Sequence, residues 1–112
     1  MVIQDFERYM QATGYELRTV SAGSGSYIVL TVLVPSGASK GKSCDVAVKR
    51  SDANPWVPES AVHVKPHLVP MGQRSSQASE LGPEWQYLSR RFERPPTPKA
   101  FFAHLLTVIG EI

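Results

Sequence analysis

The sequence predicts an α+β domain, because residues 1–112 have a helical pattern near each end and strand-like segments between them. A chain of 112 residues has the ordinary length of one domain and is long enough to bury a hydrophobic core. Hydrophobic residues make up 42% of the chain and charged residues 20%, which is typical of a globular protein. We therefore expect a four-stranded antiparallel meander with an N-terminal helix and C-terminal helices.

The first segment has the period of a short amphipathic helix. Its hydrophobic residues recur at spacings of three and four: Val2, Ile3, Phe6, Tyr9 and Met10. Gly14 is expected to end the helix, because glycine adopts a left-handed conformation easily. The segment lacks the apolar core of a signal peptide, and no apolar run is long enough to cross a bilayer. We expect a cytoplasmic protein with no membrane partner.

Four segments have the composition or the alternation of β-strands. Residues 27–34 are β-branched and apolar on both faces, which predicts a central strand covered on both sides. The others are about 15–21, 44–49 and 61–64. Residues 22–26 (AGSGS) predict a turn between the first two strands, and Pro35 ends the second one.

The second half of the chain predicts less regular structure before its last helix. Residues 65–83 are polar and irregular and predict a long loop, followed by a short helix or turn over 85–92 and a rigid spacer over 93–98. Thr97 can cap the last helix, and Pro98 suits its first position. The apolar stripe of this helix contains Phe101, His104, Leu105, Val108, Ile109 and Ile112.

This order of elements, with three short motifs, resembles the ubiquitin-conjugating (UBC-like) family. The motifs are Pro35 after a strand, Pro-Trp-Val-Pro at residues 55–58, and EWQYLSRRF at residues 84–92 ahead of FFAHLLTVIGEI. The last motif resembles bacterial UBC-like proteins in particular, and the resemblance extends from about Asp5 to Ile112. It implies that residues 1–112 are a single UBC-like domain.

The resemblance also implies a function and partners. Conjugating enzymes receive a ubiquitin-like protein from an adenylating activating enzyme as a thioester and transfer it to an amine. The expected partners are therefore a ubiquitin-like protein and an activating enzyme, with no cofactor. By resemblance, the first helix would contact the activating enzyme through Gln4, Phe6 and Arg8. Trp85 is expected mainly to fill the core, with a contact role as the alternative, in which Arg90 and Arg91 present charge to a partner.

The chain departs from the family where the nucleophile is expected. In catalytic members the cysteine lies between the fourth strand and the tryptophan, but residues 65–84 contain no cysteine and no His-Pro-Asn tripeptide. The chain is either an inactive or divergent member, or its cysteine has been replaced. The loop residues that could take part in catalysis are Ser75, Ser76, Ser79 and His67, among which the sequence does not choose.

Other candidate chemistry is disfavoured. Cys44 alternates with Val46 and Val48, which predicts a buried core residue rather than a nucleophile. His63 and His67 are too few to form a zinc site, so no metal is expected. His104 is expected to be partly buried and hydrogen-bonded rather than to act as a base. A net charge of +2 is too balanced for a nucleic-acid-binding protein.

Three hypotheses follow. The first is a component of a bacterial conjugation pathway for a ubiquitin-like protein, with its usual cysteine missing or substituted. The second is a non-catalytic UBC-fold module that binds a ubiquitin-like protein or an activating enzyme. The third is an unrelated α+β interaction domain, since fold analogy alone does not establish function.

Overall fold

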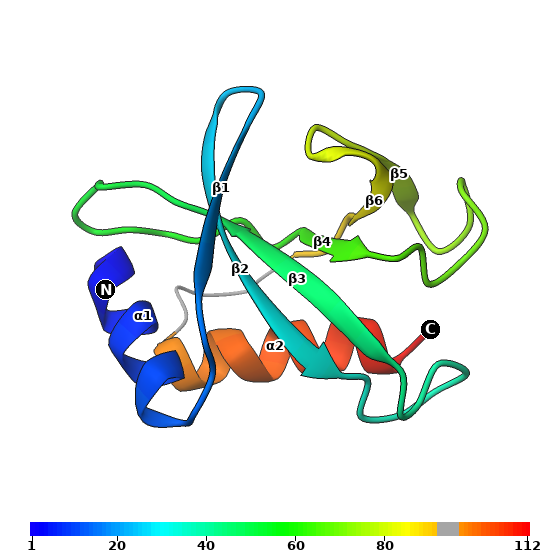
Figure 1. Ribbon diagram of the computed structural model, residues 1–112, viewed down its shortest axis with the longest axis horizontal. Coiled ribbons are helices and arrows are strands. Elements are labelled where there is room, and N and C mark those ends of the chain that lie inside the picture. Colours follow the sequence, from blue (N-terminus) through cyan, green and yellow to red (C-terminus); the bar gives the residue numbers. More distant parts are fainter. Residues whose placement is uncertain (92–96) are drawn as a thin grey trace.

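The computed structural model describes residues 1–91 and 97–112, and in these residues the chain forms an α+β fold (Figure 1). In chain order the elements are α1 (Ile3–Ala12), β1 (Arg18–Ala22), β2 (Gly25–Leu33), β3 (Ser43–Lys49), β4 (Val62–Lys65), β5 (Ser76–Ser79), β6 (Gly82–Leu88) and α2 (Pro98–Gly110). The α+β class with a helix at each end is therefore confirmed. Neither of these helices is long and apolar enough to cross a membrane.

The strands form a single antiparallel sheet in the order β1-β2-β3-β4-β6-β5. This sheet has six strands in the described residues, whereas the sequence predicts four. The loop predicted over 65–83 contains β5. The short helix or turn predicted over 85–92 is wrong for residues 85–88, because residues 82–88 form β6. β6 pairs with β4, where Leu88 lies opposite Val62 and Gln86 opposite Val64. Residues 92–96, which include most of the predicted spacer, lie outside the described residues.

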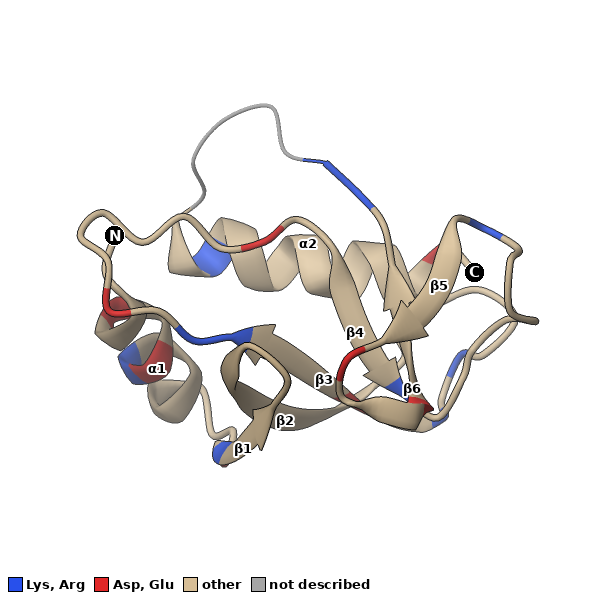
Figure 2. Ribbon diagram, turned by 90° about the horizontal axis from the view of Figure 1, so that it is seen from above, with Lys and Arg blue, Asp and Glu red and all other residues tan. Residues whose placement is uncertain are grey.

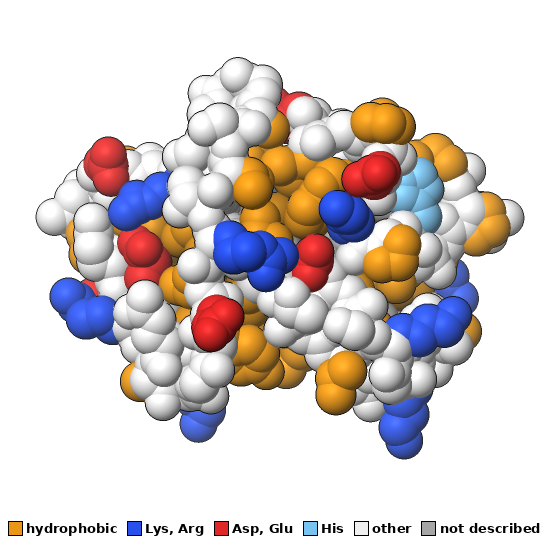
Figure 3. Space-filling view, viewed as in Figure 1, with side chains coloured by type: hydrophobic (Ala, Val, Ile, Leu, Met, Phe, Trp, Pro, Cys, Tyr) orange, Lys and Arg blue, Asp and Glu red, His pale blue; other side chains and the backbone are white. Residues whose placement is uncertain are grey.

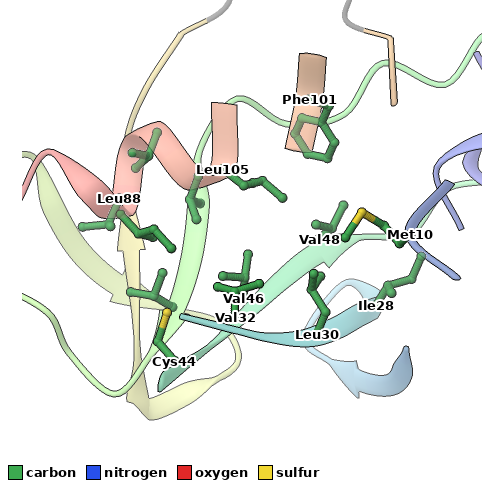
Figure 4. Packing of buried hydrophobic residues seen from close by; sticks show 14 of the residues in the cluster. Met10, Ile28, Leu30, Val32, Cys44, Val46, Val48, Leu88, Phe101 and Leu105 are labelled. Atoms are coloured by element: carbon green, nitrogen blue, oxygen red, sulfur yellow. The ribbon is translucent and has the colours of Figure 1, made fainter. Parts of the chain in front are cut away.

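Both helices pack on the same face of the sheet (Figure 2). The strand residues on this helix-covered face point toward α2 and form the main core (Figure 4). They are Ile28, Leu30, Val32, Cys44, Val46, Val48, Val62, Val64 and Leu88. Because side chains alternate along a strand, the odd-numbered residues of β2, β3, β4 and β6 lie on the opposite, helix-free face.

The start of α2 and the end of α1 agree with the sequence prediction, whereas α2 ends at Gly110, before Ile112. The Thr97 hydroxyl accepts a hydrogen bond from the Ala100 amide at 3.2 Å and caps α2. Gly14 follows α1 with a φ of +96°, a conformation that glycine adopts more readily than other residues. The Phe101 ring of α2 lies 5.2 Å from that of Phe6 in α1, which joins the helices. His104 is hydrogen-bonded to the Ser60 carbonyl at 2.8 Å, as expected for a partly buried histidine.

The helix-free face is covered by the sheet itself. The turn between β1 and β2 meets the turn between β5 and β6, where Glu80 accepts hydrogen bonds from the hydroxyls of Tyr27 and Ser24. The two hairpins lie at opposite edges of the sheet, so the sheet must curl for their turns to touch. A second hydrophobic cluster lies inside this curl and contains Tyr27, Val29, Ala47 and Trp85.

Two leucines of β2 allow a test of the main core. Leu30 is fully buried in the core, whereas Leu33 on the same strand is 66% exposed. We expect Leu30→Ala to lower the free energy of unfolding by about 2–5 kcal/mol, because it leaves a cavity. Leu33→Ala should change it by less than about 0.5 kcal/mol. Urea unfolding monitored by circular dichroism measures both, and equal losses would contradict the assignment of the two faces.

Candidate functional site

A row of side chains crosses the helix-free face with His63 at its centre. The register places five residues of neighbouring strands side by side, in the order Val29, Ala47, His63, Tyr87 and Gln77. The His63 ring lies between two tyrosine rings, Tyr27 and Tyr87, each with its centroid 5.1 Å away and tilted toward edge-to-face geometry. These contacts fix the imidazole between aromatic walls.

A cavity of about 270 Å³ opens beside this row, between the two hairpins. It is lined by Tyr27, Lys49, Glu59, His63, Gln77, Ala78, Glu80 and Tyr87. Hydrophobic side chains show between the hairpins in the space-filling view, with acidic and basic groups beside them (Figure 3). The cavity therefore combines aromatic walls with two carboxylates, one ammonium group and one imidazole. We call it the His63 cavity.

The two ring nitrogens of His63 have different surroundings. Nδ1 lies 2.8 Å from Ser79 Oγ, which also accepts a hydrogen bond from the Leu81 amide. Nε2 is buried without a hydrogen-bond partner among the described residues, because Glu59 Oε2 at 3.7 Å is too distant. Burial lowers the pKa of His63, and the nearby Glu59 carboxylate opposes this effect. We take burial to dominate, so the imidazole is neutral at pH 7 with an unsatisfied Nε2.

Glu80 connects the edge of the cavity to both hairpins. Its carboxylate accepts hydrogen bonds from Tyr27 and from Ser24, whose hydroxyl lies 3.2 Å from Oε1. The hydrogen bond from Tyr27 is the largest cause that holds the pKa of Glu80 below its ordinary value of 4.5. Lys49 donates a hydrogen bond to Ser24 Oγ at 2.8 Å and adds positive charge beside Glu80. Glu80 is thus ionised at neutral pH and partly compensated by Lys49.

The four loop candidates occupy different environments. Among the three candidate serines, Ser79 is hydrogen-bonded to a histidine, His63. Ser76 is buried and its hydroxyl donates to the Pro70 carbonyl at 3.2 Å, whereas Ser75 is exposed with a φ of +59°. His67 lies 3.0 Å from the backbone carbonyls of Pro83 and Trp85, so its Nε2–H fastens the loop to β6.

The candidate partner contacts are divided between surface and core. Gln4, Arg8 and Arg91 are exposed. Phe6 is fully buried against Trp56 and Phe101, so its predicted contact with a partner is corrected to a role in the core. Trp85 is 9% exposed in the cluster on the helix-free face. Arg90 is partly buried and its Nε donates to Glu111 Oε1 at 2.7 Å.

Cys44 lies in the main core, as its alternation with Val46 predicts. It is 1% exposed, and burial raises the pKa of its thiol to about 11. Thioester exchange requires an accessible thiolate, which this environment opposes. Within the described ranges, no three His, Cys, Asp or Glu side chains are grouped closely enough to hold a metal ion.

Sequence reasoning considered His63 as a zinc ligand or as a surface or loop residue, and it missed the cavity. The signal for its orientation was present, because Val62 and Val64 flank it and must face the core. Its neighbours could not be found in the same way. Glu80 and Tyr87 belong to the β5–β6 hairpin, which was not predicted, and they approach His63 only through the pairing of β6 with β4.

Comparisons with protein-family models, with curated proteins and with solved structures find no match to this chain. The function of the site therefore has to be argued from its own residues.

We predict that Glu80 makes the stability of the fold depend on pH. Because its pKa is lowered in the folded state, its carboxylate stabilises the fold above pH 4.5, and this contribution is lost as pH falls through the lower folded value. The free energy of unfolding of Glu80→Gln should therefore fall less steeply than that of the wild type between about pH 5 and pH 3. Glu84→Gln, which removes an exposed partner of Lys65, is the matched control. Identical pH profiles for Glu80→Gln and the wild type would contradict the prediction.

We also predict that Cys44 is unreactive in the folded protein. A pKa of about 11, against the ordinary 9.0, leaves roughly a hundredfold less thiolate at about pH 8. Burial should slow the reaction further. A thiol-specific chromogenic disulfide should therefore modify Cys44 at least about a hundred times more slowly in buffer than in urea. Rapid modification of the native protein would show that the thiol is accessible.

Proposed function

We propose that this chain is a non-catalytic, UBC-like binding module for a ubiquitin-like protein or its activating enzyme. The observation that carries the proposal is the position of its single thiol. Cys44 is 1% exposed on the helix-covered face of the sheet, and residues 65–84 offer no other cysteine. A thioester intermediate therefore has no suitable acceptor in the chain. What remains is a folded domain with polar surfaces and a cavity.

The UBC-like part of the proposal is supported by the sequence. The Pro-Trp-Val-Pro segment and the EWQYLSRRF motif resemble the family, and the element order begins and ends with a helix. Strands β1 to β4 are neighbours in chain order within the six-stranded sheet, an order that is compatible with the proposed fold family. Exposed residues of α1, Gln4 and Arg8, are the proposed contacts with an activating enzyme. Arg91 is a further exposed cation beyond β6.

One observation favours a second candidate function, a conjugating enzyme with a serine nucleophile. Ser79 Oγ lies 2.8 Å from His63 Nδ1, and His63 in turn faces Glu59. In that reaction the Ser79 oxygen would attack the thioester carbonyl while His63 takes the hydroxyl proton. The carbon–sulfur bond would break, and the departing thiolate would take up the proton. The product would be an oxyester on Ser79 and a free thiol on the donor.

Against this second candidate, Ser79 Oγ accepts the Leu81 amide and does not line the His63 cavity. The hydroxyl serves instead to hold the histidine ring. We therefore place the binding module first.

A combined charging and binding experiment tests the proposal. The chain is mixed with ATP and with the ubiquitin-like protein and the activating enzyme encoded nearest to its gene. We expect a complex on size exclusion with at least one of these proteins and no covalent adduct on a denaturing gel. Arg8→Glu should weaken binding to the activating enzyme, whereas Arg18→Glu, on exposed β1, is the control.

Three outcomes would contradict the binding module. An adduct that reductant removes and that Cys44→Ala abolishes would show an active thiol. An adduct that resists reductant and is lost in Ser79→Ala would establish the serine enzyme. Absence of both adduct and complex with either protein would exclude the UBC-like partners.

A further inference from the structure

We infer that the His63 cavity receives a cationic side chain, the ammonium of a lysine or the guanidinium of an arginine, from the protein partner. This inference rests on the proposed function, because it identifies what the binding module recognises. Three features of the cavity support it: a buried imidazole nitrogen without a hydrogen-bond partner, a carboxylate that pairs with no lysine or arginine among the described residues, and aromatic walls.

The first feature is His63 Nε2. The side chain is 4% exposed and lines the cavity, and its Nε2 lies 3.7 Å from Glu59 Oε2 without a hydrogen-bond partner in the described residues. A buried polar atom without a partner is costly, so such atoms commonly mark a place where a ligand binds. The Ser79 hydroxyl can donate to Nδ1 or accept from it, so the ring can present a bare Nε2 lone pair to an incoming N–H donor.

The second feature is the charge of the cavity. Glu59 and Glu80 contribute two negative charges and Lys49 one positive charge, while His63 is neutral. Lys49 donates a hydrogen bond to Ser24 and lies near Glu80, so its charge compensates Glu80. Among the described residues, Glu59 has an ion-pair contact only with His63. Glu59 is 44% exposed and so remains available at the mouth. This balance repels an anionic ligand and favours a cation.

The third feature is the pair of tyrosines. The rings of Tyr27 and Tyr87 line the cavity on either side of His63. Aromatic walls attract ammonium and guanidinium groups through the electron density of the ring faces, and they also pack against the aliphatic stem of a lysine or arginine. A cavity of about 270 Å³ is large enough for the end of one such side chain. The three features together are those of a binding pocket for a basic side chain.

The first arm of the test uses small probes on the full-length, isotope-labelled protein. The ¹⁵N resonances of the His63 ring are followed by NMR during titration with Nα-acetyl-lysine amide or Nα-acetyl-arginine amide. We expect a saturable shift with at least one of these probes and none with Nα-acetyl-norleucine amide, which keeps the stem but lacks the charge. Absence of a saturable shift with both cationic probes, or equal shifts with norleucine, would overturn the inference.

The matched variant is Glu59→Gln, which keeps the size of the exposed side chain and should not disturb the fold. It should weaken binding of the cationic probe by about tenfold, as expected for loss of one charge-assisted hydrogen bond. Glu84→Gln removes an exposed carboxylate outside the cavity and should leave binding unchanged. Equal weakening in both variants would indicate a general charge effect and would contradict the assignment.

The second arm identifies the source of the cation. The partner that forms the complex is compared before and after chemical acetylation of its lysines and, separately, after modification of its arginines. If modification of the partner weakens the complex as much as Glu59→Gln does, the cation in the cavity is a side chain of the partner. If the free probes bind but neither modification matters, the cavity takes a free amine instead, and the inference is wrong while the binding module stands. If no complex forms but the probes bind, the proposed function fails and the cation site remains.

Discussion

Both helices pack on the same face of the sheet, so the strands themselves have to cover the other face. A flat sheet would leave Tyr27, Val29, Ala47 and Trp85 open to water, although these residues are almost completely buried. The curl that brings the β1–β2 turn onto the β5–β6 turn provides the cover. Hydrophobic burial stabilises this arrangement, and the hydrogen bonds from Tyr27 and Ser24 to Glu80 fix its geometry. The shape of the helix-free face follows from this one contact between the ends of the sheet.

The same curl creates the conditions for a site. His63 lies in the middle of the face and would be surrounded by water on an open sheet. Between the two hairpins it loses that water, which keeps the imidazole neutral and leaves Nε2 without a partner. A valine at this position would fill the space without the free-energy cost of burying an unpaired polar atom. The placement of a polar ring here accords with the proposed cation site.

The sequence predicts the parts of the fold in which one pattern dominates. α2 has a cap, a proline in its first turn and a regular apolar stripe, and β2 has a continuous β-branched run, so both lie where they are expected. β5 and β6 could not be predicted in this way. β5 is short and polar, and β6 begins with Gly82 and Pro83, two residues that normally indicate a turn. Their pairing depends on β4, a contact between segments distant in the chain. The part of the site that β5 and β6 contribute, Gln77, Ala78, Glu80 and Tyr87, was missed for the same reason.

The two faces of the sheet also separate the chemistry of the chain. Cys44 has an even position on β3 and points into the main core, whereas His63 has an odd position on β4 and points to the other face. Side chains alternate along both strands, so no change of rotamer can bring the thiol to the imidazole. Only a shift of register by one residue would do so, and it would also turn Val46, Val62 and Val64 out of the core. A Cys44–His63 pair is therefore incompatible with this fold. The polar groups of the His63 cavity are thus kept apart from the thiol, which accords with the proposed binding role.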